Sequence, residues 1–278
     1  MKLPKLPRLL ASVTIGLGFL SLGLTSLPRV WGGTRHLDPA QVVPLDLISP
    51  QQRDSVADVI ANSSFHRQGA PESFPCHPKV YLSLLNEPAL TLALWQDLSN
   101  ESPARLWQVG PDQYQGSDGS GTSATWEFVY RTPRLHVLHV QLDYVSPHGN
   151  IQLTGRAVLV VHTEYFRHGQ AENWVKHDVD LYLKIDSKGW RAVAKTARPL
   201  IEKVMEDQVQ EAGWFVSLMG RLVEMYPNWA CQVAERGSDI RPEVRQNFRA
   251  LIQQTRRPGC FSGRPTLTEA AETPPKLR

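Results

Sequence analysis

Hydrophobic and polar residues alternate with a period of two through the middle of the chain, which is typical of strands with one buried face. The clearest stretch is residues 124–131 (ATWEFVYR), where Ala, Trp, Phe and Tyr occupy every second position. Residues 136–144 and 175–184 alternate in the same way. Residues 156–166 are apolar on both faces, which predicts a central strand.

Short turn sequences separate these stretches. Residues 104–118 predict two further strands around a turn at Gly110–Pro111–Asp112, and the turns TPR, SPHGN and HGQAEN follow later in the chain. Successive strands joined by short turns form an antiparallel meander. We therefore expect an α+β fold whose sheet has one aromatic and aliphatic face and one charged face.

Helical spacing of apolar residues precedes the predicted sheet. Residues 79–98 are rich in leucine, but Pro88 interrupts a continuous helix. Two short helices that meet at Asn86–Glu87 are predicted instead. A short amphipathic helix is predicted earlier, within residues 49–63.

Helical spacing also returns after the sheet. A long amphipathic helix is predicted from Pro199 to Tyr226, and Pro227 ends it. Residues 228–235 and 242–254 predict further short helices. The tail from Gly263 has the composition of a disordered segment.

The N-terminus has the pattern of an export signal. Lys2, Lys5 and Arg8 precede an uncharged run from Leu9 to Leu27. Cleaved signals have apolar cores of about 7–15 residues and a small-x-small site, which SLPRVWGG lacks. A single spanning helix needs about 20 apolar residues. Export is therefore expected, with the domain either anchored at the outer face of a membrane or released as a periplasmic or secreted protein.

Composition excludes some classes of function. The 278 residues include 30 Lys and Arg against 27 Asp and Glu, in mixed order, so nucleic-acid binding has little electrostatic support. Cys76, Cys231 and Cys260 show no zinc-ligand spacing. An odd number leaves one thiol free if the others pair. A Cys231–Cys260 bridge is preferred, because these residues flank a short helical segment, and three unpaired thiols are the alternative.

These patterns divide the chain into five segments. They are a signal peptide or anchor (1–30), a linker with a short helix (31–73), an α+β domain (74–230), a helical extension (231–260) and a disordered tail (261–278).

The order of the predicted elements carries a resemblance. Two short helices, a meander with one apolar face and a long C-terminal helix resemble the helix-grip fold of the START-like (SRPBCC) superfamily. This superfamily includes polyketide cyclase/aromatase-type and lipid- or steroid-binding proteins. The stretch LNEPALTLALWQDL is similar to the helix-and-tryptophan opening of many such domains. The resemblance covers Lys79 to Tyr226, about half of the chain, and includes no catalytic motif.

The resemblance implies a sheet curved around the long helix, with an elongated apolar cavity between them. The membrane segment and the extra C-terminal helices depart from simple members of the superfamily, which puts their intracellular roles in doubt. The whole chain is also similar to an uncharacterised exported bacterial family.

Nine residues are predicted to face the cavity. For each of them, the alternative is that it is an ordinary residue of the hydrophobic core. They are Trp126, Phe128, Tyr130, Leu138, Tyr144, Tyr165, His177, Phe215 and Met219. Tyr144, Tyr165 and His177 would supply polarity, together with Thr163.

The charged face offers candidate ligands for a cation. Asp178 and Asp180 share a face of their strand, where His162 or Glu164 of a neighbouring strand would join them. A solvated charged face is the preferred interpretation, so neither a metal nor another cofactor is predicted.

Other catalytic motifs are missing from the sequence. His136 and His139 lie three apart on a strand and therefore point to opposite faces. Residues 116–124 (GSDGSGTSA) lack the Gly-Lys-Ser/Thr ending of a P-loop, and the chain has no G-x-S-x-G.

Three hypotheses for function remain. The leading one is an exported or membrane-tethered domain that binds an apolar small molecule or lipid in the cavity. The second is a cyclase- or hydrolase-type enzyme that uses polar cavity groups such as His177 and Tyr165. The third is a non-catalytic envelope interaction protein whose cavity is filled by side chains.

Overall fold

The structure is a computed structural model of the whole chain. It describes residues 38–99, 103–119, 121–145, 152–168, 172–187, 215–255 and 274. The predicted export segment, the first part of the predicted long helix, Cys260 and the remainder of the tail lie outside these residues. Among the helices of the described residues, none combines the length and hydrophobicity needed to span a bilayer.

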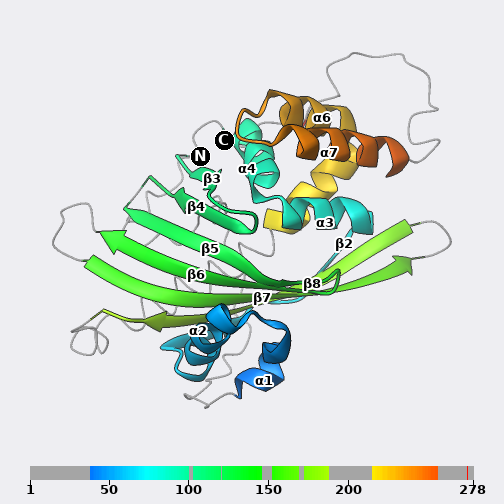
Figure 1. Cartoon of the computed structure of the whole chain (residues 1–278). Coiled ribbons are helices and arrows are strands. Elements are labelled where there is room, and N and C mark those ends of the chain that lie inside the picture. Colours follow the sequence, from blue (N-terminus) through cyan, green and yellow to red (C-terminus); the bar gives the residue numbers. More distant parts are fainter. Residues whose placement is uncertain are drawn as a thin grey trace, which may run out of the picture.

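An eight-stranded antiparallel sheet forms the centre of the fold (Figure 1). Its order is β1-β8-β7-β6-β5-β4-β3, and β2 pairs with β8 beside this path. The strands are β1 Phe65–Gln68, β2 Glu72–Pro75, β3 Arg105–Gln108, β4 Gln113–Ser117, β5 Thr122–Arg131, β6 Leu135–Val145, β7 Gln152–His168 and β8 Glu172–Ile185. The predicted α+β class and the predicted meander from β3 to β8 are confirmed.

The strands β1 and β2 were not predicted. Each has four residues, which is too short for a period of two to be recognised. Both are held by backbone ladders to β8, and the Ser64 N–H extends the β1 ladder by donating to the Leu183 carbonyl. Pairing with a distant strand, which local sequence cannot show, therefore creates this edge of the sheet.

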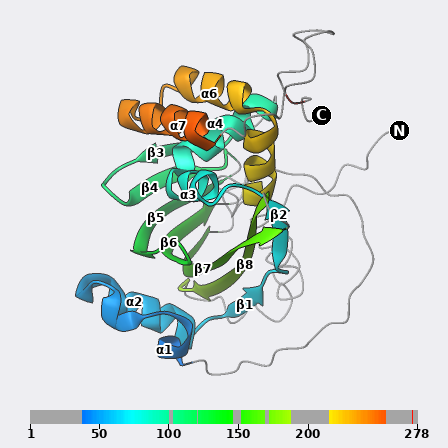
Figure 2. The ribbon, with the colours of Figure 1, turned by 90° about the vertical axis from the view of Figure 1, so that its right-hand side faces the viewer.

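Helices cover both faces of the sheet, so the fold has three layers (Figure 2). On one face lie α1 Pro39–Val42, the 3-10 helix η1 Leu45–Leu47 and α2 Pro50–Ala61. On the other face lie α3 Pro78–Asn86, α4 Pro88–Leu98, the helical residues 215–225, α6 Pro227–Arg236 and α7 Pro242–Thr255.

Prolines set the helix boundaries as predicted. Only Glu87 separates the last residue of α3 from Pro88, which is the first residue of α4. Pro227 likewise separates residues 215–225 from α6. Proline suits the first turn of a helix, where its missing N–H would have no partner, but it cannot continue a preceding helix.

The larger core lies between the sheet and the five helical segments of the second layer. Phe74, Tyr81, Leu94, Met219 and Trp229 belong to it, and each is at most 1% exposed. Burial on this scale is the main favourable contribution to folding.

A smaller core lies under α2 on the opposite face. Val56, Val59 and Ile60 of the helix pack with Val137 and Val158 of the sheet. The expectation that this face is charged throughout is therefore wrong where α2 covers it. The amphipathic helix buries its own apolar side there and needs apolar partners from the sheet.

Ion pairs also fasten α2 to the sheet. Asp58 accepts hydrogen bonds from Lys184 Nζ at 2.7 Å and from Arg156 Nη2 at 2.9 Å. The Lys184 hydrogen bond is the main influence that lowers the pKa of Asp58 to about 2. Arg156 also pairs with Asp186, because its Nε group donates to Asp186 Oδ2 at 2.8 Å.

Candidate functional site

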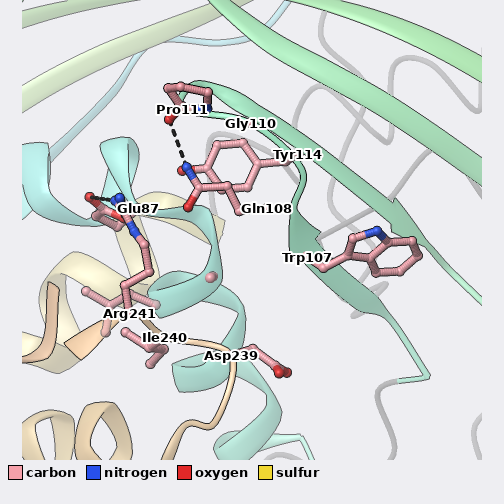
Figure 3. Close-up of a pocket in the computed structure, with 11 residues that line it drawn as sticks. Glu87, Trp107, Gln108, Gly110, Pro111, Tyr114, Asp239, Ile240 and Arg241 are labelled. Carbon is pink, nitrogen blue, oxygen red and sulfur yellow. Dashed lines mark hydrogen bonds and ion pairs between the residues drawn. The ribbon is translucent and has the colours of Figure 1, made fainter. Parts of the chain in front are cut away.

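A pocket of about 510 Å³ opens between the β3–β4 hairpin, the start of α4 and the α6–α7 connection (Figure 3). Figure 3 shows Tyr114 and Gln108 on the hairpin side, with Glu87 and Arg241 on the helical side. The pocket is lined by Glu87, Ala89, Leu90, Trp107, Gln108, Gly110, Pro111, Tyr114, Asp239, Ile240 and Arg241.

The hairpin wall is fixed by its own turn. Gln108 is the cross-strand partner of Tyr114, and the Gln108 Nε2 group donates to the Pro111 carbonyl at 2.8 Å. The Val109 N–H donates to the Gln113 carbonyl at 2.9 Å. These bonds hold the predicted Gly110–Pro111 turn against the pocket.

Tyr114 joins the pocket to the aromatic residues of the sheet. It is 2% exposed, it stacks on its cross-strand partner Trp126 with centroids 6.0 Å apart, and it meets Phe128 edge-on at 6.2 Å. Burial raises the pKa of Tyr114, so its hydroxyl stays neutral. Trp126 and Phe128, which were predicted to line a cavity, thus support a pocket wall from behind.

The helical wall carries a charge pair. The Arg241 Nη2 group lies 3.3 Å from Glu87 Oε1. Burial raises the pKa of Glu87 even though Arg241 acts in the opposite direction. The Arg241 Nη1 group also lies 3.5 Å from Glu243 Oε1. Because the side chain is 45% exposed and a guanidinium has five N–H donors, the donors not directed at these two carboxylates remain for an anionic ligand group.

The predicted polar residues lie elsewhere, around α3 and β8. The Tyr81 hydroxyl is 3.1 Å from His177 Nδ1 and 3.2 Å from Thr163 Oγ1, and all three residues are buried. Glu72 Oε2 lies 3.9 Å from His177 Nε2. The Tyr165 hydroxyl donates to the Pro133 carbonyl at 2.6 Å. None of these five side chains lines the pocket of Figure 3.

Other predicted cavity residues pack as core. Phe215 meets Trp95 edge-on at 5.4 Å, and Met219 is fully buried in the larger core. Leu138 packs against the same core. Tyr144 is half-buried at the end of β6, opposite Thr122.

Tyr130 lies on the opposite face from the other aromatic residues of β5, so its place in a shared cavity was wrongly predicted. Strict alternation puts it with Phe128, but the register of β5 shifts between these two residues. Phe128 pairs with Leu138, whereas Tyr130 pairs with Val137. One extra residue in a β-bulge reverses the side to which later residues point. Tyr130 therefore packs in the smaller core.

Sequence reasoning missed the residues that form most of the pocket. Glu87, Trp107, Tyr114 and Arg241 come from three distant stretches, and no local pattern connects them. The predicted helix break at Asn86–Glu87 and the predicted turn at Gly110–Pro111 were the available signals, because both mark irregular backbone where pockets form.

Comparisons with known proteins give low similarities. No protein-family model and no curated protein matches the sequence. Among solved structures, the chain is similar to a conserved protein from Geobacillus kaustophilus, with 15% identity, 52% of this chain and 95% of that chain covered, and a TM-score of 0.33.

Two further structures are similar at the same level. A START superfamily protein from Mycobacterium smegmatis has 9% identity, coverage of 56% of this chain and 97% of that chain, and a TM-score of 0.33. The di-domain ARO/CYC protein BexL from the BE-7585A biosynthetic pathway has 12% identity, coverage of 65% and 59%, and a TM-score of 0.31. At these TM-scores, the helix-grip order rests on the elements themselves: two short helices, an antiparallel meander and a following helix against one face.

Proposed function

We propose that the protein binds a small molecule with an apolar, ring-sized body and one anionic end in the pocket beside the β3–β4 hairpin. The observation that carries this proposal is that two walls of different chemistry face each other across the pocket. The hairpin wall presents Tyr114, backed by Trp126, and the helical wall presents Leu90, Ile240 and Arg241.

Each wall contributes in its own way. Apolar ligand surface removed from water contributes roughly 25 cal/mol per Å². Arg241 would orient the ligand, since arginine binds carboxylates and phosphates through paired hydrogen bonds. The volume of about 510 Å³ lies in the range of small-molecule sites.

We also propose that the ligand is a lipid or another envelope component. This rests on the sequence of the N-terminus, whose basic start and apolar run favour export or tethering. A domain held at a membrane surface would meet such ligands directly.

The enzyme alternative depends on the buried polar groups near β8. The Tyr81 hydroxyl contacts both His177 Nδ1 and Thr163 Oγ1, and none of these three residues lines the pocket. The filled-core alternative agrees with the packing of Phe215 and Met219. Occupation of the pocket by a ligand would separate the first hypothesis from both.

The proposal is tested with the full chain and the fluorescent anion 8-anilinonaphthalene-1-sulfonate as a probe. Substitution Arg241→Gln is expected to raise the Kd of the probe about tenfold or more, because a hydrogen bond to a charged group contributes about 1.5–3 kcal/mol. Arg236→Gln is the matched control, since Arg236 pairs with Asp97 outside the pocket.

Native mass spectrometry of the gently extracted full chain supplies a second measurement. A bound amphiphile that the Arg241→Gln protein loses and the Arg236→Gln protein keeps would support the proposal. Equal probe affinity in wild type and both variants, with no bound amphiphile, would contradict it.

A further inference from the structure

Four metal-ligating side chains gather on the face of the sheet opposite the pocket. The nearest ligand atoms of His162, Asp178 and Asp180 all lie within 4.8 Å of one another. His66 joins them, with its Nε2 3.5 Å from Asp180 Oδ1. These four residues are called the His/Asp cluster below.

Strand register explains why the four side chains meet. His162 of β7 is the direct cross-strand partner of Asp178 of β8, and Asp180 is two residues further along the same face. His66 of β1 reaches Asp180 from the other side of β8, and its ring stacks on Tyr182 with centroids 4.3 Å apart and planes 8° apart. Three strands thus hold the donors.

The two aspartates lack a strong counter-charge. Among the residues that the structure describes, no lysine or arginine lies within ion-pair distance of either one, and Lys176 pairs with Glu164 instead. Asp180 is only 8% exposed.

We propose that the His/Asp cluster binds one divalent ion of the zinc class. Imidazole nitrogen together with carboxylate oxygen suits Zn²⁺, Co²⁺ and Mn²⁺, whereas Mg²⁺ prefers octahedral oxygen ligands. Four ligands match a closed zinc site, in which metal–ligand distances are about 2.0–2.2 Å. The donor atoms of His162, Asp178 and Asp180 lie within 4.8 Å of one another, so an ion bound between them would have to draw them closer together.

The ion would connect the edge of the sheet to its interior. β1 has only four residues, and within the described sheet its partner is β8. A metal shared by His66 on β1, Asp178 and Asp180 on β8 and His162 on β7 would fasten this short strand through side chains. This role is independent of ligand binding in the pocket, which lies on the other face.

The test is calorimetric titration of the full chain, stripped with a chelator, using Zn²⁺ alone. Wild type is expected to bind one Zn²⁺ per chain and to gain thermal stability. His162→Gln and Asp178→Asn are each expected to raise the Kd at least about 100-fold, since changes to outer-shell partners already cost 10–100-fold. Both side chains are partly exposed, so the variants should fold.

Asp143→Asn is the control, because Asp143 is exposed on β6 outside the cluster, and it should leave the Kd unchanged. Co²⁺ bound to the wild type should give an absorption spectrum without thiolate-to-cobalt charge transfer, because no cysteine belongs to the cluster. Absence of Zn²⁺ binding, wild-type affinity in both variants, or a thiolate spectrum would each overturn the proposal.

Discussion

The two faces of the sheet are held to their helices by different forces. The face under α3, α4 and residues 215–225 meets a large aromatic and aliphatic core. The face under α2 combines a small valine and isoleucine core with the Asp58 ion pairs. The first attachment should therefore respond chiefly to lost volume and to protonation of the buried His136, whereas the second should respond to salt as well as to pH.

The largest expected effect breaks the first attachment. Phe74 is fully buried and contacts Tyr81 and His177 edge-on or tilted. Phe74→Ala should lower the free energy of unfolding by about 3–5 kcal/mol, since it removes apolar contacts and leaves a cavity. Urea unfolding measures this. Phe166→Ala, at a 41% exposed position beside its cross-strand partner Trp174, is the control and should cost much less, about 1 kcal/mol.

An intermediate effect concerns His136, on the same face as Phe128. Burial, followed by repulsion from Arg131, lowers the pKa of His136 to about 4 from 6.5. The folded state thus disfavours the charged form, and the unfolded chain binds the proton first. Stability from this residue is complete above pH 6.5 and is lost as the pH falls toward 4, by up to about 3 kcal/mol.

Melting temperature against pH measures this loss, and His136→Gln should flatten the curve. Some slope should remain, because burial also lowers the pKa of His139, which contacts Ser55 of α2 on the other face. An unchanged curve in the His136→Gln protein would contradict the assignment.

The smallest expected effect concerns the ion pairs that attach α2 to the sheet. Asp58→Ala should cost about 1 kcal/mol, because solvent screens pairs that are a third exposed. The Asp58 pKa of about 2 lies below its usual 3.8, so its stabilisation is present above pH 3.8 and is lost as the pH falls through 2. Salt should weaken the effect. Asp54→Ala, at an exposed position on α2, should be neutral.

Regular patterns in the sequence predicted much of the fold. Alternation identified the strands of the meander, and Pro88 and Pro227 marked helix boundaries, because these signals depend on neighbouring residues alone. β1 and β2 were not predicted, because these strands form only through pairing with the distant strand β8.

The candidate sites were harder to predict for the same reason. The pocket combines Glu87, Tyr114 and Arg241, which only the tertiary fold brings together. The face shared by Asp178 and Asp180 was visible from alternation, but the contribution of His66 required the position of β1.

The bulge in β5 has a consequence for how the chain tolerates insertions and deletions. Val129 is the extra residue between Phe128 and Tyr130, and it lets one strand give an aromatic ring to each layer. Deleting Val129 would remove the bulge, and strict alternation would then keep Tyr130 on the face opposite Phe128, where it already packs. Arg131, which reaches Asp112 and covers the Phe128 ring, would stay on the Phe128 side. Loss of one residue at the bulge should therefore disturb the two layers less than loss of one residue from a regular part of the strand, where every later side chain would change faces.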